Sequence, residues 1–192
     1  MVISKSFLLK MDNIIESFKH NDLTIEIYQD DYIPNPREWD NLGKMICFHD
    51  RYTLGDKHDF TTESLEAFLT ENDDKLFYLP IYAYEHGGIT IKTTPFNCPW
   101  DSGKVGYIYI TRVETEENDI NDPYELLRQE VKSFDDYLQG NSYGYLIKDN
   151  EGEYLESCGG YLGEVSYCKE EAINMANYLD KTLPKQFNFS FA

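Results

Sequence analysis

The sequence predicts a single α+β domain, residues 1–192, with a largely antiparallel or mixed sheet and about three helices. Seven short runs rich in Tyr, Ile and Val are typical of strands, and three longer segments show helical spacing of apolar residues. Strands and helices do not alternate strictly, which favours α+β over a parallel βαβ fold. The chain is long enough for one well-buried core, and no change of composition marks a boundary, so one domain is expected.

The expected strands are bounded by Gly, Asp or Asn, which end regular structure. They cover residues 23–28, 44–49, 75–84, 88–94, 105–112, 143–149 and 153–163. Two links, "EHGG" at 85–88 and "NEG" at 150–152, are short enough to be hairpin turns. Strands joined by such links must be antiparallel.

The clearest helix is predicted over residues 123–138, where apolar residues recur at steps of three and four. Asp122 is suited to the cap position and Pro123 to the first helical position, and Glu125 stands where a capping box needs an acid. The apolar stripe consists of Tyr124, Leu127, Val131, Phe134 and Leu138.

Three further segments are expected to be helical. Residues 61–72 and 168–183 are the longer ones, and "MDNIIESFKH" at 11–20 is expected to form a short helix.

Charge is the strongest compositional signal, with a formal net charge of −18. Consecutive thirds of the chain carry −5, −7 and −6, so the acidity belongs to the folded body, which an apolar fraction of 41% is sufficient to build. Such a surface repels phosphate backbones, which argues against direct binding to DNA or RNA and favours a basic protein partner.

A cytoplasmic location is expected. No apolar run approaches the length of a membrane span, and the N-terminal segment has no more than three consecutive apolar residues, as in Phe7 to Leu9, too few for a signal peptide. Four cysteines without a C-x-x-C pair fit reduced thiols better than a disulfide framework.

A metal site is the first chemical hypothesis. Cys47 and His49 share one face of an expected strand, and His58 and Cys98 follow in loops, so the four could form a Cys2His2 zinc set. Their spacing matches no standard finger or ribbon. The alternative is a buried cysteine beside a hydrogen-bonded core histidine. This arrangement needs no metal, and no cofactor is then predicted.

Hydrolytic chemistry is the second hypothesis, because aspartate beside histidine can act as a general base or bind a hard cation. In so acidic a chain, however, such neighbours are expected from composition alone. The sequence also lacks the common nucleophile, metalloprotease, P-loop and dinucleotide motifs, so no catalytic residue is predicted. The residues concerned are Asp40, His49, Asp50, Asp56, His58 and Asp59.

A rigid loop platform is the third hypothesis. Two Trp–Asp pairs, Trp39–Asp40 and Trp100–Asp101, stand in loops punctuated by proline and glycine. Arg37 and Arg51 are expected to form fork-shaped pairs with nearby carboxylates, and Arg51 completes the platform. The alternative is that both tryptophans fill the core.

Two acidic segments are predicted to bind the partner. Carboxylates held on a folded scaffold with tyrosines between them can imitate the phosphates that nucleic-acid-binding proteins recognise. The alternative is that the charge only keeps the protein soluble. The predicted partner-binding residues are Glu114, Glu116, Glu117, Asp119, Asp122, Asp149, Glu151, Glu153 and Glu156.

The blocks "NPREWDNLGKMICFHDRYTLGDKHD" and "TTPFNCPWDSG" and the segment "ESCGGYLG" resemble a family of small acidic proteins of phages and other mobile elements. The resemblance brings no catalytic residues. It implies an anti-defence role, as an anti-CRISPR or antirestriction protein acting in the bacterial host cytoplasm. The predicted function is therefore inhibition of a host defence protein by occupying its basic nucleic-acid channel. The alternative is a metal-dependent hydrolase or metal-stabilised binding protein centred on His49 and His58.

Overall fold

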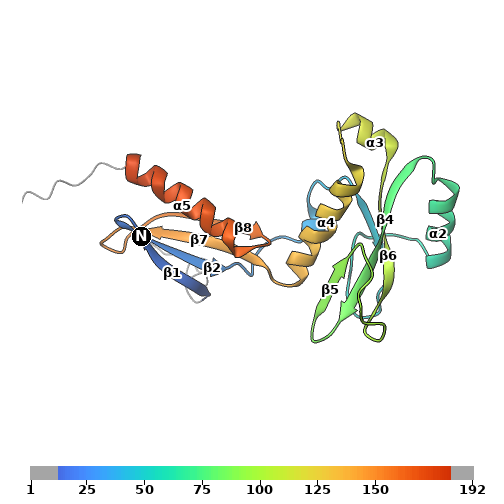
Figure 1. The fold of residues 1–192 in the computed structure, drawn as a ribbon, viewed down its shortest axis with the longest axis horizontal. Helices are drawn as coiled ribbons and strands as arrows, with labels where there is room; N and C mark the ends of the chain where they lie inside the picture. Colours follow the sequence, from blue (N-terminus) through green and yellow to red (C-terminus); the bar gives the residue numbers. More distant parts are fainter. Residues whose placement is uncertain (1–12, 183–192) are drawn as a thin grey trace, which may run out of the picture. The chain divides into compact units, whose positions relative to one another are not determined.

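The computed structural model describes residues 13–182, which form two compact units (Figure 1). Unit 1 contains residues 13–33 and 140–182, and unit 2 contains residues 34–139. Unit 2 is thus an insertion within unit 1. No change of composition marks its ends, so this division could not be predicted from the sequence.

The α+β class and the antiparallel pairing are confirmed. The described residues contain eight strands, four α-helices and one 3-10 turn, and every strand pair is antiparallel. No helix within residues 13–182 is long and apolar enough to cross a bilayer. The elements in chain order are β1 Ile14–His20, β2 Leu23–Gln29, η1 Pro36–Glu38, β3 Lys44–Cys47, α2 Thr62–Glu71, β4 Leu76–Glu85, β5 Ile89–Lys92, β6 Ser102–Thr111, α3 Arg112–Glu117, α4 Pro123–Leu138, β7 Ser142–Lys148, β8 Tyr154–Leu162 and α5 Val165–Thr182.

Unit 1 is a four-stranded sheet of order β1-β2-β7-β8 with α5 along one face (Figure 1). Ile25 and Ile27 of β2 point toward Ala172 and Ala176 of α5, and all four are buried completely. Small alanines allow the helix to approach the sheet closely, so the apolar branched side chains of β2 fill the space between them. The two central strands, β2 and β7, are neighbours although all of unit 2 lies between them in the chain.

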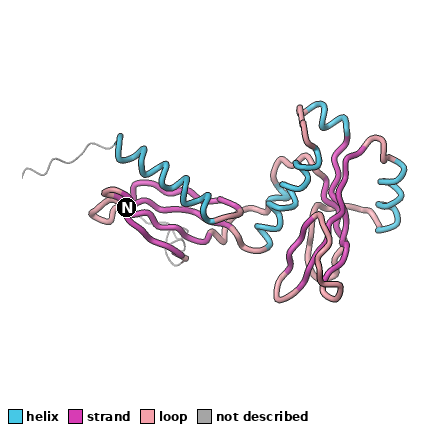
Figure 2. The backbone as a smooth tube through the Cα atoms, viewed as in Figure 1, coloured by secondary structure: helices cyan, strands magenta, loops and turns pink. Residues whose placement is uncertain are grey.

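Unit 2 is a second sheet of order β3-β6-β4-β5 with helices on both faces (Figure 2). The helix α4 covers one face, where Leu127, Val131 and Phe134 are buried. These residues belong to the apolar stripe predicted for this helix. On the other face, Leu65 and Leu69 of α2 form a separate cluster with β3 and the start of β4.

The short helix predicted over residues 11–20 is wrong for its described part. Residues 14–20 form β1, which pairs with β2, while residues 11 and 12 lie outside the described residues. The link Asn21–Asp22 closes a two-residue hairpin in which Asn21 has a φ of 53°. Asparagine tolerates this left-handed conformation, and β-branched Ile14 and Ile15 favour a strand, so the hairpin outweighed a weak helical pattern.

Both predicted hairpin turns are present, with Gly87 and Gly152 at positive φ. The cap of α4 is also as predicted, because the Asp122 carboxylate accepts the Glu125 backbone N–H at 2.9 Å. The Glu125 carboxylate, however, accepts from Arg128 and Gln129 within the helix. These hydrogen bonds lower the pKa of Glu125, Gln129 more than Arg128.

Candidate functional site

Arg37 organises the segment 35–59. Its side chain is only 3% exposed, and it forms the expected fork with Asp56, Nε to Oδ1 at 3.0 Å and Nη2 to Oδ2 at 2.9 Å. Its Nη1 donates to Glu130 of α4 at 2.9 Å. Burial alone would lower the pKa of Arg37, but the bonds to Asp56 and Glu130 outweigh it and raise the pKa, so the guanidinium stays charged.

The same carboxylates also hold the backbone. Glu130 accepts the N–H groups of Leu42 and Gly43, both at 3.0 Å, and Asp56 accepts that of Met45 at 2.8 Å. Each guanidinium nitrogen of the buried arginine donates to a carboxylate or a carbonyl oxygen. A buried ionic network therefore fastens the segment 35–59, which includes β3, to α4. The remaining side chains of the segment are presented from this base.

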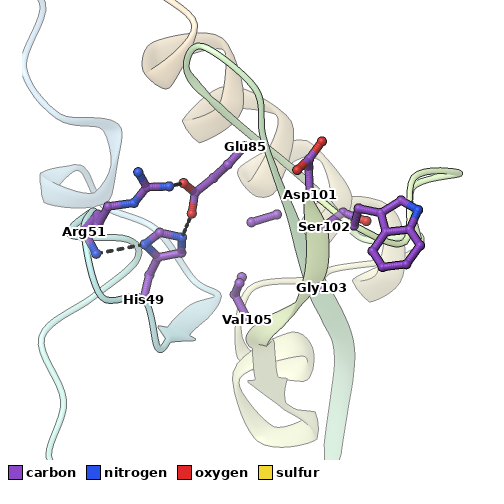
Figure 3. Close-up of a pocket in the computed structure, with 9 residues that line it drawn as sticks. His49, Arg51, Glu85, Asp101, Ser102, Gly103 and Val105 are labelled. Atoms are coloured by element: carbon purple, nitrogen blue, oxygen red, sulfur yellow. Dashed lines mark hydrogen bonds and ion pairs between the residues drawn. The ribbon is translucent and has the colours of Figure 1, made fainter.

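An open cavity of about 320 Å³ lies beside this segment in unit 2 (Figure 3). Ala83 and Val105 line its apolar part. His49, Arg51 and Glu85 lie on one side and Asp101, Ser102 and Gly103 on the other, where β6 begins (Figure 3). Trp100 completes the lining. Glu85, at the end of β4, was not among the predicted site residues, because nothing local distinguishes it from other surface acids.

His49 is occupied on both ring nitrogens. Nδ1 accepts the backbone N–H groups of Arg51 and Tyr52, each at 3.2 Å, so the ring proton must be on Nε2, which lies 2.5 Å from Glu85 (Figure 3). Glu85 also pairs with Arg51. A general base needs a free lone pair directed at its substrate, and His49 has none to offer in this arrangement. Its role here is to shape the loop.

The four candidate zinc ligands are not brought together. The ring of His58 donates from Nε2 to the carbonyl oxygen of Cys47 at 3.1 Å, and the Cys98 thiol lies 3.8 Å from Asp101. Burial raises the pKa of the Cys47 thiol to about 12, which opposes the thiolate that zinc requires. Within residues 13–182, no group of three or more His, Cys, Asp or Glu side chains could hold a metal ion. The alternative given for these residues, a buried cysteine and a hydrogen-bonded histidine, describes the arrangement.

The loop platform is assembled in part. Arg51, Trp100 and Asp101 line the cavity, whereas Trp39 and Asp40 do not. The alternative that both tryptophans fill the core is wrong, because Trp39 is 45% and Trp100 is 90% exposed. Residue type alone does not distinguish a surface tryptophan from a buried one.

At the end of the unit 2 sheet opposite the cavity, two acidic segments meet, the α2–β4 turn and the region of α3. The turn between α2 and β4 is joined to the start of α3, where Arg112 donates from its backbone to Lys75 at 2.9 Å and from its side chain to the Asp74 carbonyl at 2.7 Å. The two segments that these bonds join carry, besides Glu114, six acidic residues and, at their junction, the basic residues Lys75 and Arg112. This set, called the acidic rim below, consists of Glu71, Asp73, Asp74, Glu116, Glu117 and Asp119.

Some of the predicted partner-binding carboxylates accept hydrogen bonds within the protein, and others do not. Glu114 accepts from the backbone and hydroxyl of Thr111 in a capping box, and Asp122 caps α4. Glu116, Glu117 and Asp119 are exposed, and no side-chain hydrogen bond or ion pair is present on them among residues 13–182.

The second predicted acidic segment belongs to unit 1. Asp149 accepts the N–H groups of Glu151 and Glu153, each at 2.9 Å, and so closes the β7–β8 turn. Glu156 accepts the N–H of its neighbour Ser157. Of the four acids predicted in this segment, Glu151 and Glu153 are exposed, and no side-chain hydrogen bond or ion pair is present on them within residues 13–182.

Compared with protein-family models, with curated proteins and with solved structures, the chain matches none of them. The resemblance to acidic mobile-element proteins therefore stays a prediction, and the arguments that follow depend on the site itself.

Proposed function

We propose that this protein is an inhibitor that binds a basic nucleic-acid channel of a host defence protein, a CRISPR effector or a restriction enzyme, through the acidic rim. The observation that supports it is the meeting of two acidic segments, far apart in the sequence, at one end of the unit 2 sheet. A surface of this kind competes for the same positive groups that hold phosphates.

The distribution of charge between the units favours partner binding over the alternative that the charge only keeps the protein soluble. Unit 2 has 21 acidic and 10 basic residues, a net charge of −11, whereas the residues assigned to unit 1 have 14 and 7, a net charge of −7. The field of unit 2 attracts a positively charged partner, and such association is fast and weakens as salt rises. Glu116, Glu117 and Asp119 have no internal side-chain hydrogen bond or ion pair within residues 13–182, so they can bind a partner without loss of internal contacts. Asp73, in contrast, accepts the Tyr78 hydroxyl at 3.0 Å.

Charge exchange at the rim tests the proposal. The variant combines Glu116→Lys, Glu117→Lys and Asp119→Asn, because Asp119 has a φ of 52° that asparagine tolerates and lysine does not. Glu114 is left intact because it caps α3. The matched control, Glu38→Lys with Asp40→Asn and Glu170→Lys, changes the net charge equally at exposed positions that do not belong to the rim.

The assay immobilises the full chain, captures nucleases from lysates of bacteria with active CRISPR and restriction systems, and measures DNA cleavage by the captured enzyme. We expect the protein to inhibit cleavage, short duplex DNA to compete with it, and the rim variant to inhibit at least about tenfold less well than the control. Equal inhibition by both variants, or binding that duplex DNA does not disturb, would contradict the proposal.

A further inference from the structure

Trp100 is the most exposed large apolar side chain of the described residues, at 90%. Its loop is nevertheless held firmly. The Ser102 hydroxyl donates to the carbonyl of Cys98, and the Glu85 backbone N–H donates to the carbonyl of Asp101 at 2.9 Å. The backbone that carries the indole is therefore ordered before a ligand binds, so a ligand that covers the ring loses less entropy in ordering the loop.

The cavity beside Trp100 has one carboxylate without a strong partner. Arg51 is paired with Glu85, and Glu85 also accepts from His49, so these charges are satisfied within the protein. Asp101 is 47% exposed on its side chain, and its carboxylate has only the Cys98 thiol at 3.8 Å and the His86 ring at 3.9 Å. Both contacts are weaker than an ordinary hydrogen bond.

An aromatic face and an available carboxylate in a unit of net charge −11 are complementary to a cation. Tryptophan is the best aromatic acceptor of a cation over its face, and a carboxylate accepts two parallel N–H groups from a guanidinium. The open volume of about 320 Å³ is ample for one side chain. We propose that this cavity binds the arginine side chain of a protein partner, with the guanidinium against Trp100 and its N–H groups on Asp101.

This site is separate from the acidic rim. The strands β4 and β6 each have ten residues, and the rim lies at one end of them and the cavity at the other, a separation of roughly 30 Å at the usual rise per residue. The inference therefore does not depend on the proposed inhibition, and either can fail without the other.

The test uses the full chain with Trp39→Phe, which leaves Trp100 as the only tryptophan. Its fluorescence is titrated with N-acetyl-arginine amide and with the citrulline analogue, which has nearly the same shape and no charge. We expect saturable binding of the arginine compound, at least about fivefold weaker binding of citrulline, and a similar loss on Asp101→Asn.

The matched control is Asp40→Asn, which removes the carboxylate of the other Trp–Asp pair, away from the cavity. It should leave the affinity for arginine unchanged. For Trp100→Ala, amide NMR shifts of Ser102 and Gly103 replace fluorescence, and they should no longer respond to the ligand. Equal binding of arginine and citrulline, equal loss in the two Asp→Asn variants, or no saturable binding overturns the inference.

Discussion

Arg37 and Arg51 lie fourteen positions apart in the segment 35–59, and each pairs with a carboxylate, but one pair is buried and the other is exposed. Arg37 is 3% exposed and joins Asp56 and Glu130, whereas Arg51 is 71% exposed and pairs with Glu85 at the wall of an open cavity. Arg37 forms the predicted fork with a carboxylate of its own segment, Asp56, whereas the partner of Arg51 is Glu85 of the distant strand β4. The difference teaches that burial decides whether such a pair supports the fold or leaves a surface on which a partner can act.

Removing the buried guanidinium should produce the largest effect. Arg37→Met leaves two carboxylates in the interior without a counter-charge, and we expect unit 2 to lose about 3–5 kcal/mol of unfolding free energy. Tryptophan fluorescence during urea denaturation measures it, because both tryptophans belong to unit 2. Adding Glu130→Gln should restore part of the loss. A loss below about 1 kcal/mol would show that the network is dispensable.

Alkaline pH should produce the next effect. Burial raises the pKa of the Cys47 thiol from 9.0 to about 12. The contribution of this thiol to the free energy of unfolding is therefore complete below about pH 9, the pKa in the unfolded chain, and is lost as the pH rises toward the pKa in the folded protein. Between about pH 9 and pH 11, ionisation of this thiol in the unfolded chain should lower the free energy of unfolding by about 2–3 kcal/mol. The measurement is the change of unfolding free energy over that range, which should be smaller in Cys47→Ala. Replacing the exposed Cys158 with alanine is the control.

The acids of α3 allow the same comparison on a smaller scale. Glu114→Ala removes a capping box and should cost about 1 kcal/mol, whereas Glu117→Ala should change stability by less than about 0.5 kcal/mol. Urea denaturation of the two single variants compares them directly. Similar losses of stability in the two variants would mean that the exposed acids of the rim also stabilise the fold and are not reserved for a partner.

The smallest effect is expected from Arg51→Ala. Its exposed pair with Glu85 should contribute less than about 1 kcal/mol and should weaken further between about 50 mM and 500 mM salt. Denaturation at both salt concentrations measures this. The loss in Arg37→Met should be nearly independent of salt, so an equal salt dependence of both variants would remove the contrast between them.

Much of the fold followed from local patterns. The strand runs, the two glycine hairpins and the Asp122 cap of α4 depend on neighbours a few residues away, and these neighbours are visible in the chain. The site followed only in part. Arg51, Trp100 and Asp101 were expected to act together, but Glu85, which joins His49 to Arg51, was not expected, because it comes from a distant strand.

By itself, the sequence determined the α+β class, the antiparallel pairing of the strands that the two hairpin turns join, the excess of negative charge and the presence of two Trp–Asp loops. Only the tertiary structure decided that unit 2 is inserted between β2 and β7, which arginine is buried, and which carboxylates remain free of internal partners. Backbone conformation follows from short-range sterics and hydrogen bonds. Burial depends on contacts between segments many residues apart, and no local pattern records those contacts.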